Sequence, residues 1–231
     1  MEKITKIIDE TFLKKDATER EIKAVAEKTK KYNFRGLCVF PEHSKAVKEL
    51  LKGADVKVIT LIDEPTGASS HEKRVEMAQK AREDGSDEID VVMKIDDFKN
   101  GKYIEVLADL EEICRIMPTK VIIGSGYLTD KEIKKAAEIA KEAGAICVKT
   151  ATIKDPLDEL ELAEKAKHIM IMKESAPGLL IKASGAIRTL QDLEMMVKAG
   201  ADIIGTSSGA DIANQAAGKQ SKTAEDGRIV E

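Results

Sequence analysis

The feature of this sequence that most constrains its fold is a regular alternation along the chain. Short runs rich in Val and Ile alternate with longer stretches in which an apolar residue recurs every three or four positions. The short runs are typical of strands covered on both faces, and the longer stretches are typical of amphipathic helices. Strands are predicted at residues 6–9, 37–40, 56–62, 88–93, 120–125, 145–151, 179–184 and 202–206. Strands that alternate with helices predict right-handed βαβ units and a parallel sheet.

Eight such units in 231 residues favour a closed (β/α)8 barrel with a single domain. The alternative is an open, doubly wound sheet, but no GxGxxG motif follows the first strand as it does in a Rossmann fold. A barrel forms its active site at the carboxyl ends of its strands, and Thr150 and Gly205 lie near two of these ends.

The predicted helices carry start and stop signals. Helices are expected at residues 18–32, 69–83, 129–143 and 189–199. Thr129 and Glu132 form a capping box at the start of one of them, and Gly144 ends it.

The chain ends in a segment of different character. A last helix begins at Ser208 and fades after Gly218, and residues 219–231 are polar with little periodicity. We therefore expect a barrel domain of residues 1–218, followed by a disordered tail at 219–231.

The charge distribution limits the classes of partner. The 38 basic and 42 acidic residues are spread along the whole chain, with a formal charge of −4, so nucleic acid and membrane surfaces are not expected partners. No apolar run approaches the roughly 18 residues of a membrane span, and the first ten residues lack the layout of a signal peptide. A cytoplasmic location is predicted.

The cysteines and histidines do not form a metal-binding pattern. They are Cys38, Cys114, Cys147, His43, His71 and His168. The cysteines have no CxxC spacing and are expected to be reduced core residues. The histidines lack a second His or Cys at ligand spacing, so we expect exposed helical side chains and no metal.

Charged residues inside three predicted strands are the first candidates for chemistry. Lys149 and Lys182 lie near the ends of neighbouring strands, and Asp90 lies within another. Since side chains alternate across a strand, all three can point into the barrel mouth. Repulsion between two ammonium groups, together with burial, is expected to lower the pKa of one lysine and to activate it as an imine-forming nucleophile. The alternative is that each lysine reaches water or pairs with an acid.

Two Gly- and Ser-rich loops follow the last two strands. They read SGAIRT and GTSSG, at 184–189 and 205–209. Barrels bind phosphate at this place through backbone N–H groups and a helix N-terminus, and Ser207, Ser208 and Arg188 offer further donors. The alternative is ordinary turn and helix-cap chemistry.

Several segments together resemble a known family. The segments IDETFLKKDAT, DEIDVV, VIIGSGYLTD, ICVKTAT, IKASGAIRT and GTSSG, between Ile8 and Gly209, resemble deoxyribose-phosphate aldolase in order and spacing. The resemblance implies a (β/α)8 class I aldolase that joins acetaldehyde to glyceraldehyde 3-phosphate, reversibly, through a lysine imine and without a metal or other cofactor.

The resemblance also implies roles for individual residues. Lys149 corresponds to the imine lysine, Lys182 to the lysine that perturbs it, and Asp90 to the proton-relay acid. The residues that match positions in or around the substrate and phosphate site are Lys154, Gly185, Arg188, Gly205, Ser207, Ser208, Thr11, Asp9 and Cys38.

The sequence departs from the family pattern at several positions. KTATI, with Ala151 and Ile153, stands where the family has KTSTG, and VIIGS, with Gly124, stands where it has VIIET. Asp63 occupies a position that is usually apolar, and no tyrosine follows Tyr127. These departures leave the lysine chemistry intact and bear on substrate specificity.

We therefore expect a class I aldolase that cleaves 2-deoxy-D-ribose 5-phosphate and self-associates as a dimer or higher oligomer. The alternatives are a related imine-forming lyase or transferase with another phosphorylated sugar, and a barrel that binds a sugar phosphate without turnover.

Overall fold

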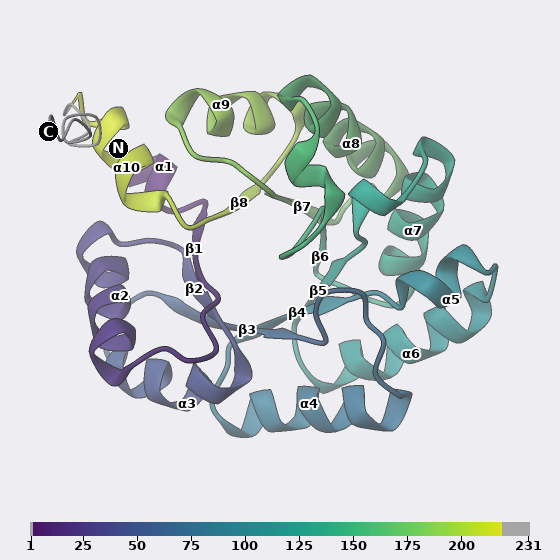
Figure 1. Cartoon of the computed structure of the whole chain (residues 1–231), viewed down its shortest axis with the longest axis horizontal. Helices are drawn as coiled ribbons and strands as arrows, with labels where there is room; N and C mark the ends of the chain where they lie inside the picture. The colour runs from purple at the N-terminus through teal and green to yellow at the C-terminus, as the bar shows by residue number, and fades with distance from the viewer. Residues whose placement is uncertain (1, 219–231) are drawn as a thin grey trace, which may run out of the picture.

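Eight parallel strands form a closed barrel at the centre of the molecule. The computed structural model describes residues 2–218, and neighbouring strands pair in chain order from β1 to β8 (Figure 1). The strands are β1 (Ile8–Phe12), β2 (Gly36–Val39), β3 (Lys57–Ile62), β4 (Glu88–Val92), β5 (Thr119–Ile122), β6 (Cys147–Lys149), β7 (Leu180–Ser184) and β8 (Ile203–Thr206). β8 pairs with β1, so the sheet has no open edge. The predicted (β/α)8 fold is confirmed.

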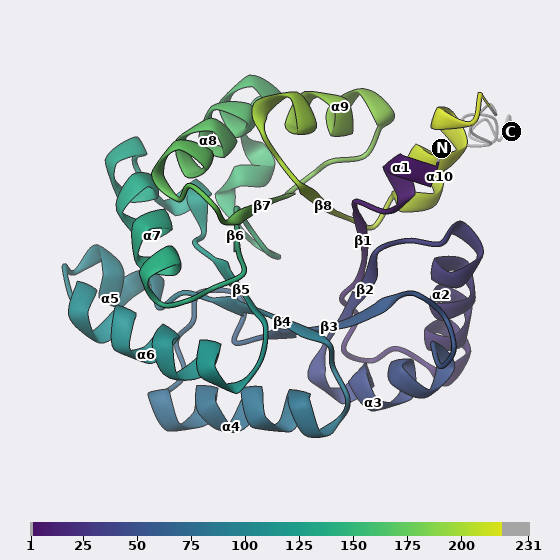
Figure 2. The same cartoon turned by 180° about the vertical axis from the view of Figure 1, so that it is seen from behind.

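Helices surround this barrel on all sides (Figures 1 and 2). They are α1 (Glu2–Thr5), α2 (Glu19–Tyr32), α3 (Pro41–Leu50), α4 (His71–Glu83), α5 (Ile95–Lys99), α6 (Tyr103–Ile116), α7 (Asp130–Glu142), α8 (Leu162–Ser175), α9 (Leu190–Ala199) and α10 (Gly209–Ala216), with 3-10 turns η1 (Ser125–Tyr127) and η2 (Pro156–Glu159). The short α1 lies beside α10, so the two ends of the barrel domain meet. Within residues 2–218, no helix is long and apolar enough to cross a membrane.

The predicted helix signals act as expected. The side chain of Thr129 accepts from the backbone of Glu132, whose carboxylate accepts from the Thr129 N–H in return. Gly144 follows the helix with a φ of +83°, which a residue without a Cβ adopts at little cost. The predicted tail at 219–231 lies outside the described residues.

Several strand boundaries differ from the prediction, and the fifth strand ends at Ile122 rather than at residue 125. The first strand begins at Ile8 rather than at residue 6, because α1 occupies the chain up to Thr5. The sixth strand ends at Lys149 rather than at residue 151. There the Thr150 hydroxyl donates to the Ser184 carbonyl at 2.8 Å and accepts from the Ser184 N–H at 2.9 Å, so a side chain continues the connection between β6 and β7.

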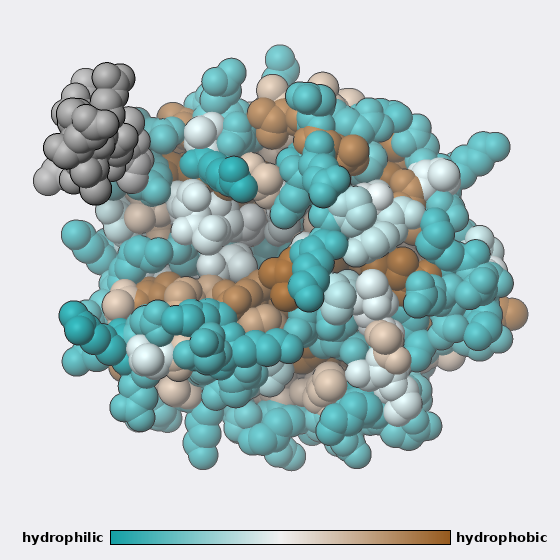
Figure 3. Space-filling model, viewed as in Figure 1, coloured by the Kyte–Doolittle hydropathy of each residue, from teal (hydrophilic) through white to brown (hydrophobic). Residues whose placement is uncertain are grey.

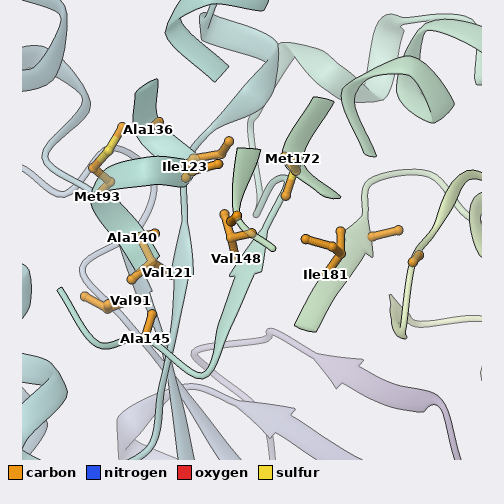
Figure 4. Packing of buried hydrophobic residues seen from close by; sticks show 14 of the residues in the cluster. Val91, Met93, Val121, Ile123, Ala136, Ala140, Ala145, Val148, Met172 and Ile181 are labelled. Carbon is orange, nitrogen blue, oxygen red and sulfur yellow. The ribbon is translucent and has the colours of Figure 1, made fainter. Parts of the chain in front are cut away.

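The main hydrophobic core lies between the sheet and the helices. Figure 4 shows strand side chains such as Val121 and Val148 beside Ala136 and Ala140 of α7 and Met172 of α8. All of these side chains are buried, and each large one contributes about 1.5–3 kcal/mol to the stability of the fold. This packing of helices against the sheet holds the strands in place around the barrel.

Candidate active site

The strand register brings the predicted lysines together. Lys149 of β6 lies directly opposite Lys182 of β7. Asp90 of β4 lies directly opposite Lys120 of β5. All four side chains are buried and joined by hydrogen bonds inside the barrel. The predicted trio of Asp90, Lys149 and Lys182 is therefore assembled by the fold.

Asp90 is the centre of the resulting hydrogen-bond network. Its Oδ2 accepts from Lys149 Nζ and from Lys182 Nζ, each at 2.8 Å. Its Oδ1 accepts from Lys120 Nζ, also at 2.8 Å. One carboxylate thus orients three ammonium groups, two of which, those of Lys120 and Lys182, also have other carboxylate partners.

The network continues toward the amino ends of the strands. Asp9 accepts from Lys182 at 2.7 Å, and Glu88 lies 2.7 Å from Lys120. The guanidinium of Arg35 donates to both carboxylates at 2.8 Å. Asp9 is therefore a partner of Lys182 beneath the site, not part of the wall that a substrate would touch.

These contacts determine the direction of the pKa shifts. Burial by itself raises the pKa of Asp90, but Lys120, Lys149 and Lys182 outweigh burial and hold that pKa well below its usual value. Burial by itself lowers the pKa of Lys182, but Asp9 and Asp90 outweigh it and raise that pKa. Lys182 is therefore not the lysine whose pKa is lowered, because carboxylates stand between the ammonium groups.

A cavity of about 210 Å³ opens beside the network. Six of the predicted site residues line it: Thr11, Lys149, Gly185, Arg188, Gly205 and Ser207. Figure 3 shows the same view as Figure 1, in which pale residues of intermediate hydropathy and brown hydrophobic residues lie together near the centre, with a mostly hydrophilic surface toward the edges. Lys149 is the one lysine that lines this cavity within the described part of the chain.

Comparison with known proteins gives a consistent result. No protein-family model matches the sequence. A deoxyribose-phosphate aldolase of Staphylococcus carnosus is 38% identical over 211 residues, which cover 90% of this chain and 94% of that protein. The chain belongs to the deoxyribose-phosphate aldolase family.

Solved structures of aldolases have the same fold. The aldolase QR15 superposes with a TM-score of 0.86 at 37% identity, over 93% of this chain and 96% of that one. A tetrameric deoxyribose phosphate aldolase from Aeropyrum pernix superposes with a TM-score of 0.83 at 27% identity, over 94% and 92% of the two chains.

Besides Asp9, three residues that the resemblance to this aldolase family places in or around the substrate and phosphate site lie outside the cavity wall. The exposed Lys154 has a φ of +63°, and its carbonyl accepts from the Tyr127 hydroxyl at 2.8 Å. Ser208 precedes α10, and its N–H donates to the Thr206 hydroxyl at 2.9 Å. Cys38 is buried with its Sγ 4.0 Å from Asp90, and burial raises the pKa of its thiol to about 11.

Lys120, Thr152 and Ser184 belong to the site although the sequence does not single them out. The hydroxyls of Thr152 and Ser184 are buried, line the cavity and have no hydrogen-bond partner within the described chain. A Cβ at Gly205 would lie 2.3 Å from the Ser184 hydroxyl, so this glycine leaves room for it. Strand alternation could have placed Lys120 inside the barrel, because Lys120 and Ile122 are two positions apart and so face the same side of β5.

The departures from the aldolase family pattern have structural consequences. Ile153 lines the cavity and packs against the cluster that contains Cys38. A Cβ at Gly124 would lie 2.4 Å from Ile95, and the φ of Gly124 is +64°. Asp63 pairs with the fully buried Arg74 and so supports α4 rather than the cavity.

The histidines differ from their predicted exposure in this aldolase chain. All three lie in helices, but His168 is buried, and its Nδ1 lies 3.2 Å from the Ser125 hydroxyl. Within residues 2–218, His168, Asp130 and Glu164 form the one group whose ligand atoms are close enough for a metal ion. The ammonium of Lys167 already lies 2.8 Å and 3.0 Å from the two carboxylates, so it offsets part of their charge.

Proposed function

We propose that this chain is a class I aldolase that cleaves 2-deoxy-D-ribose 5-phosphate, reversibly, into acetaldehyde and D-glyceraldehyde 3-phosphate. The observation that carries the proposal is Lys149, which lines the cavity while its Nζ is bonded to Asp90. Membership of the deoxyribose-phosphate aldolase family supports the same substrate.

The charge balance of the barrel interior supports Lys149 as the nucleophile. Besides Lys149, three buried or nearly buried cations, Arg35, Lys120 and Lys182, accompany the carboxylates of Asp9, Glu88 and Asp90. A neutral amine at Lys149 would reduce the excess of positive charge in this network, to which the half-exposed Lys57 beside Glu88 also contributes. Lys149 is also the cation of the set that faces the cavity.

The reaction then follows from imine chemistry. The Lys149 amine adds to the C1 aldehyde of the open-chain sugar, and loss of water gives an iminium ion. The iminium accepts the electron pair of the breaking C2–C3 bond, while the C3 hydroxyl loses its proton and becomes the aldehyde of glyceraldehyde 3-phosphate. The enamine is protonated at C2, and hydrolysis of the imine releases acetaldehyde and restores the amine.

The neighbouring groups have distinct roles in this proposal. Asp90 and Lys182, together with a water, pass the proton from the C3 hydroxyl toward C2. The raised pKa of Lys182 keeps it cationic, so it acts as a hydrogen-bond donor and not as a second nucleophile. Thr152 and Ser184 offer free hydroxyls to the bound sugar.

The phosphate group would lie at the far end of the cavity. Arg188 and Ser207 line this region, and α10 begins directly after Ser208. Helix N-termini and backbone N–H groups favour anions, which would orient the sugar for attack by Lys149.

A cleavage assay with 2-deoxyribose 5-phosphate tests this function. The released triose phosphate is reduced by a coupled dehydrogenase, and the loss of reduced nicotinamide is followed. We expect turnover by the wild type and none by Lys149→Leu. Turnover by both proteins would contradict the role of Lys149.

A second candidate is a related imine-forming lyase or transferase with another phosphorylated sugar, which the Ile153 side chain in the cavity favours. Efficient turnover of such a sugar with negligible cleavage of 2-deoxyribose 5-phosphate would support it. A barrel that only binds a sugar phosphate predicts saturable binding without imine formation.

Two further properties remain proposals. We propose that the enzyme is cytoplasmic and that it self-associates, since the Aeropyrum pernix relative is described as tetrameric. Light scattering coupled to size-exclusion chromatography tests self-association, and a mass near 25 kDa at micromolar concentration would contradict it.

A further inference from the structure

An acidic side chain lines the cavity at the end that would receive the phosphate. Asp158, in η2, is part of the cavity wall together with Gly185 and Arg188. A Cβ built on Gly185 would lie 2.8 Å from Asp158 Oδ1. The Asp158 carboxylate therefore lies where a side chain at position 185 would be, next to the glycine that the resemblance assigns to the phosphate site.

The Asp158 carboxylate forms no salt bridge within the described residues, and the ammonium of Lys165 donates to the backbone carbonyl of Asp158 at 3.4 Å. No salt bridge or side-chain hydrogen bond joins its carboxylate to another described residue, and none joins the Arg188 guanidinium to a carboxylate. A sugar phosphate carries a charge of about −1.5 to −2 at neutral pH. The cavity therefore offers this group one free guanidinium and one free carboxylate.

Asp158 is not needed to hold its own loop. The adjacent anchor is Asp155, whose Oδ1 accepts from the backbone N–H groups of Leu157 at 2.8 Å and Gly126 at 3.1 Å. The side chain of Leu157 is buried beneath the loop. A neutral replacement at Asp158 is therefore expected to leave η2 in place.

We propose that Asp158 is a specificity-determining residue that disfavours the phosphate dianion and so allows unphosphorylated 2-deoxyribose to compete as a substrate. The inference rests on the function proposed above and deepens it. Like charges a few ångströms apart in a partly solvated cavity repel, whereas a neutral hydroxymethyl end meets no such penalty. The charge of Asp158 thus reduces the preference for the phosphorylated over the unphosphorylated sugar, and it does not remove activity.

The test compares kcat/KM for 2-deoxyribose 5-phosphate and for 2-deoxyribose in matched variants. Asp158→Asn should raise the ratio of the two values roughly five- to tenfold, mainly through a lower KM for the phosphorylated sugar. Asp158→Glu keeps the charge and should resemble the wild type. Glu159→Gln makes the same charge change at an exposed neighbour outside the cavity wall and should leave the ratio unchanged.

The dependence on ionic strength distinguishes an electrostatic role of Asp158 from a purely structural one. The difference between wild type and Asp158→Asn should shrink at about 0.5 M salt, because ions screen the repulsion. Binding of inorganic phosphate, measured by calorimetry, should also be roughly five- to tenfold tighter in Asp158→Asn, and this measurement needs no turnover.

The outcomes separate this inference from the proposed function. If the wild type cleaves the phosphorylated sugar but Asp158→Asn changes neither the ratio nor phosphate binding, the role of Asp158 is refuted and the aldolase function stands. Weaker phosphate binding in Asp158→Asn would show that the carboxylate positions Arg188 instead, and would also refute it. Tighter phosphate binding without any cleavage by the wild type would support the charge effect and contradict the aldolase function.

Discussion

At the residue scale, the organising group is the carboxylate of Asp90, which accepts hydrogen bonds from three buried lysines. A buried ammonium without a partner is costly, so the carboxylate permits Lys149 to lie in an apolar strand at all. The same carboxylate holds the Lys149 amine at the base of the cavity. Stability and reactivity therefore depend on one side chain.

Replacing Asp90 tests this dependence. Asp90→Asn leaves the three ammonium groups without their shared charge partner, and we expect a loss of about 3–5 kcal/mol in the free energy of unfolding. Aldolase activity should fall at least about 100-fold with the loss of proton transfer. Urea denaturation and the coupled cleavage assay measure both effects.

The control is Asp97→Asn, since Asp97 forms a salt bridge with Lys102 near the surface. That change should cost less than about 1 kcal/mol and should leave activity unchanged. Equal losses of stability in the two variants would contradict the central role of Asp90.

The sequence predicts part of this site and misses part of it, for physical reasons. Lys149, Lys182 and Asp90 are visible because charged residues stand out in strands of Val and Ile. The carboxylates that raise the pKa of Lys182 come from strands distant in sequence, so their effect depends on the barrel register. The free hydroxyls of Thr152 and Ser184 have no sequence signal, because Thr and Ser are common in turns.

At the element scale, the short strand β6 ends where the chemistry begins. Its connection to β7 continues through the Thr150 hydroxyl, which donates to and accepts from the backbone of Ser184. This contact sets the separation between the loops that carry Thr152 and Gly185. The sequence predicts that both strands exist but not where β6 ends, because beyond Lys149 the Thr150 side chain bonds to the Ser184 backbone in place of a backbone-to-backbone hydrogen bond.

Thr150→Val tests the two hydrogen bonds between the Thr150 hydroxyl and Ser184 while it keeps the packing of the side chain. Valine has a similar shape but leaves the Ser184 N–H and carbonyl without this partner, so we expect a loss of about 1–3 kcal/mol in unfolding free energy. The KM for the phosphorylated sugar should rise. Thr150→Ser keeps the hydroxyl and should recover most of the stability, whereas an unchanged stability in Thr150→Val would refute the role of these hydrogen bonds.

At the scale of the whole molecule, closure of the barrel collects charged groups from β1 and from β4 to β7, together with Arg35 just before β2, into one interior network. Asp9, Glu88 and Asp90 each have a lowered pKa, since nearby cations outweigh the effect of burial. The alternation of strands and helices predicts the closed barrel, and eight units of this length predict the number of strands. The interior network could not be predicted in full, because it depends on which residues meet across the closed sheet.

This network predicts how stability depends on pH. A carboxylate whose pKa is lowered in the folded chain stabilises the fold above its unfolded pKa of about 4, and the contribution is lost as the pH falls through the folded pKa. The unfolding free energy of the wild type should therefore fall steeply below about pH 4. Asp90→Asn should show a shallower fall in this range, and parallel curves for the two proteins would contradict the assignment.

The central claim is that Lys149 forms the imine, and chemical trapping tests it most directly. The enzyme is incubated with acetaldehyde and borohydride, digested, and analysed by mass spectrometry, with Lys149→Leu as the matched control. We expect a reduced two-carbon adduct on Lys149, loss of activity in proportion to its formation, and retained activity when borohydride is added without acetaldehyde. An adduct confined to another lysine, or none in an enzyme that still turns over, would contradict the account.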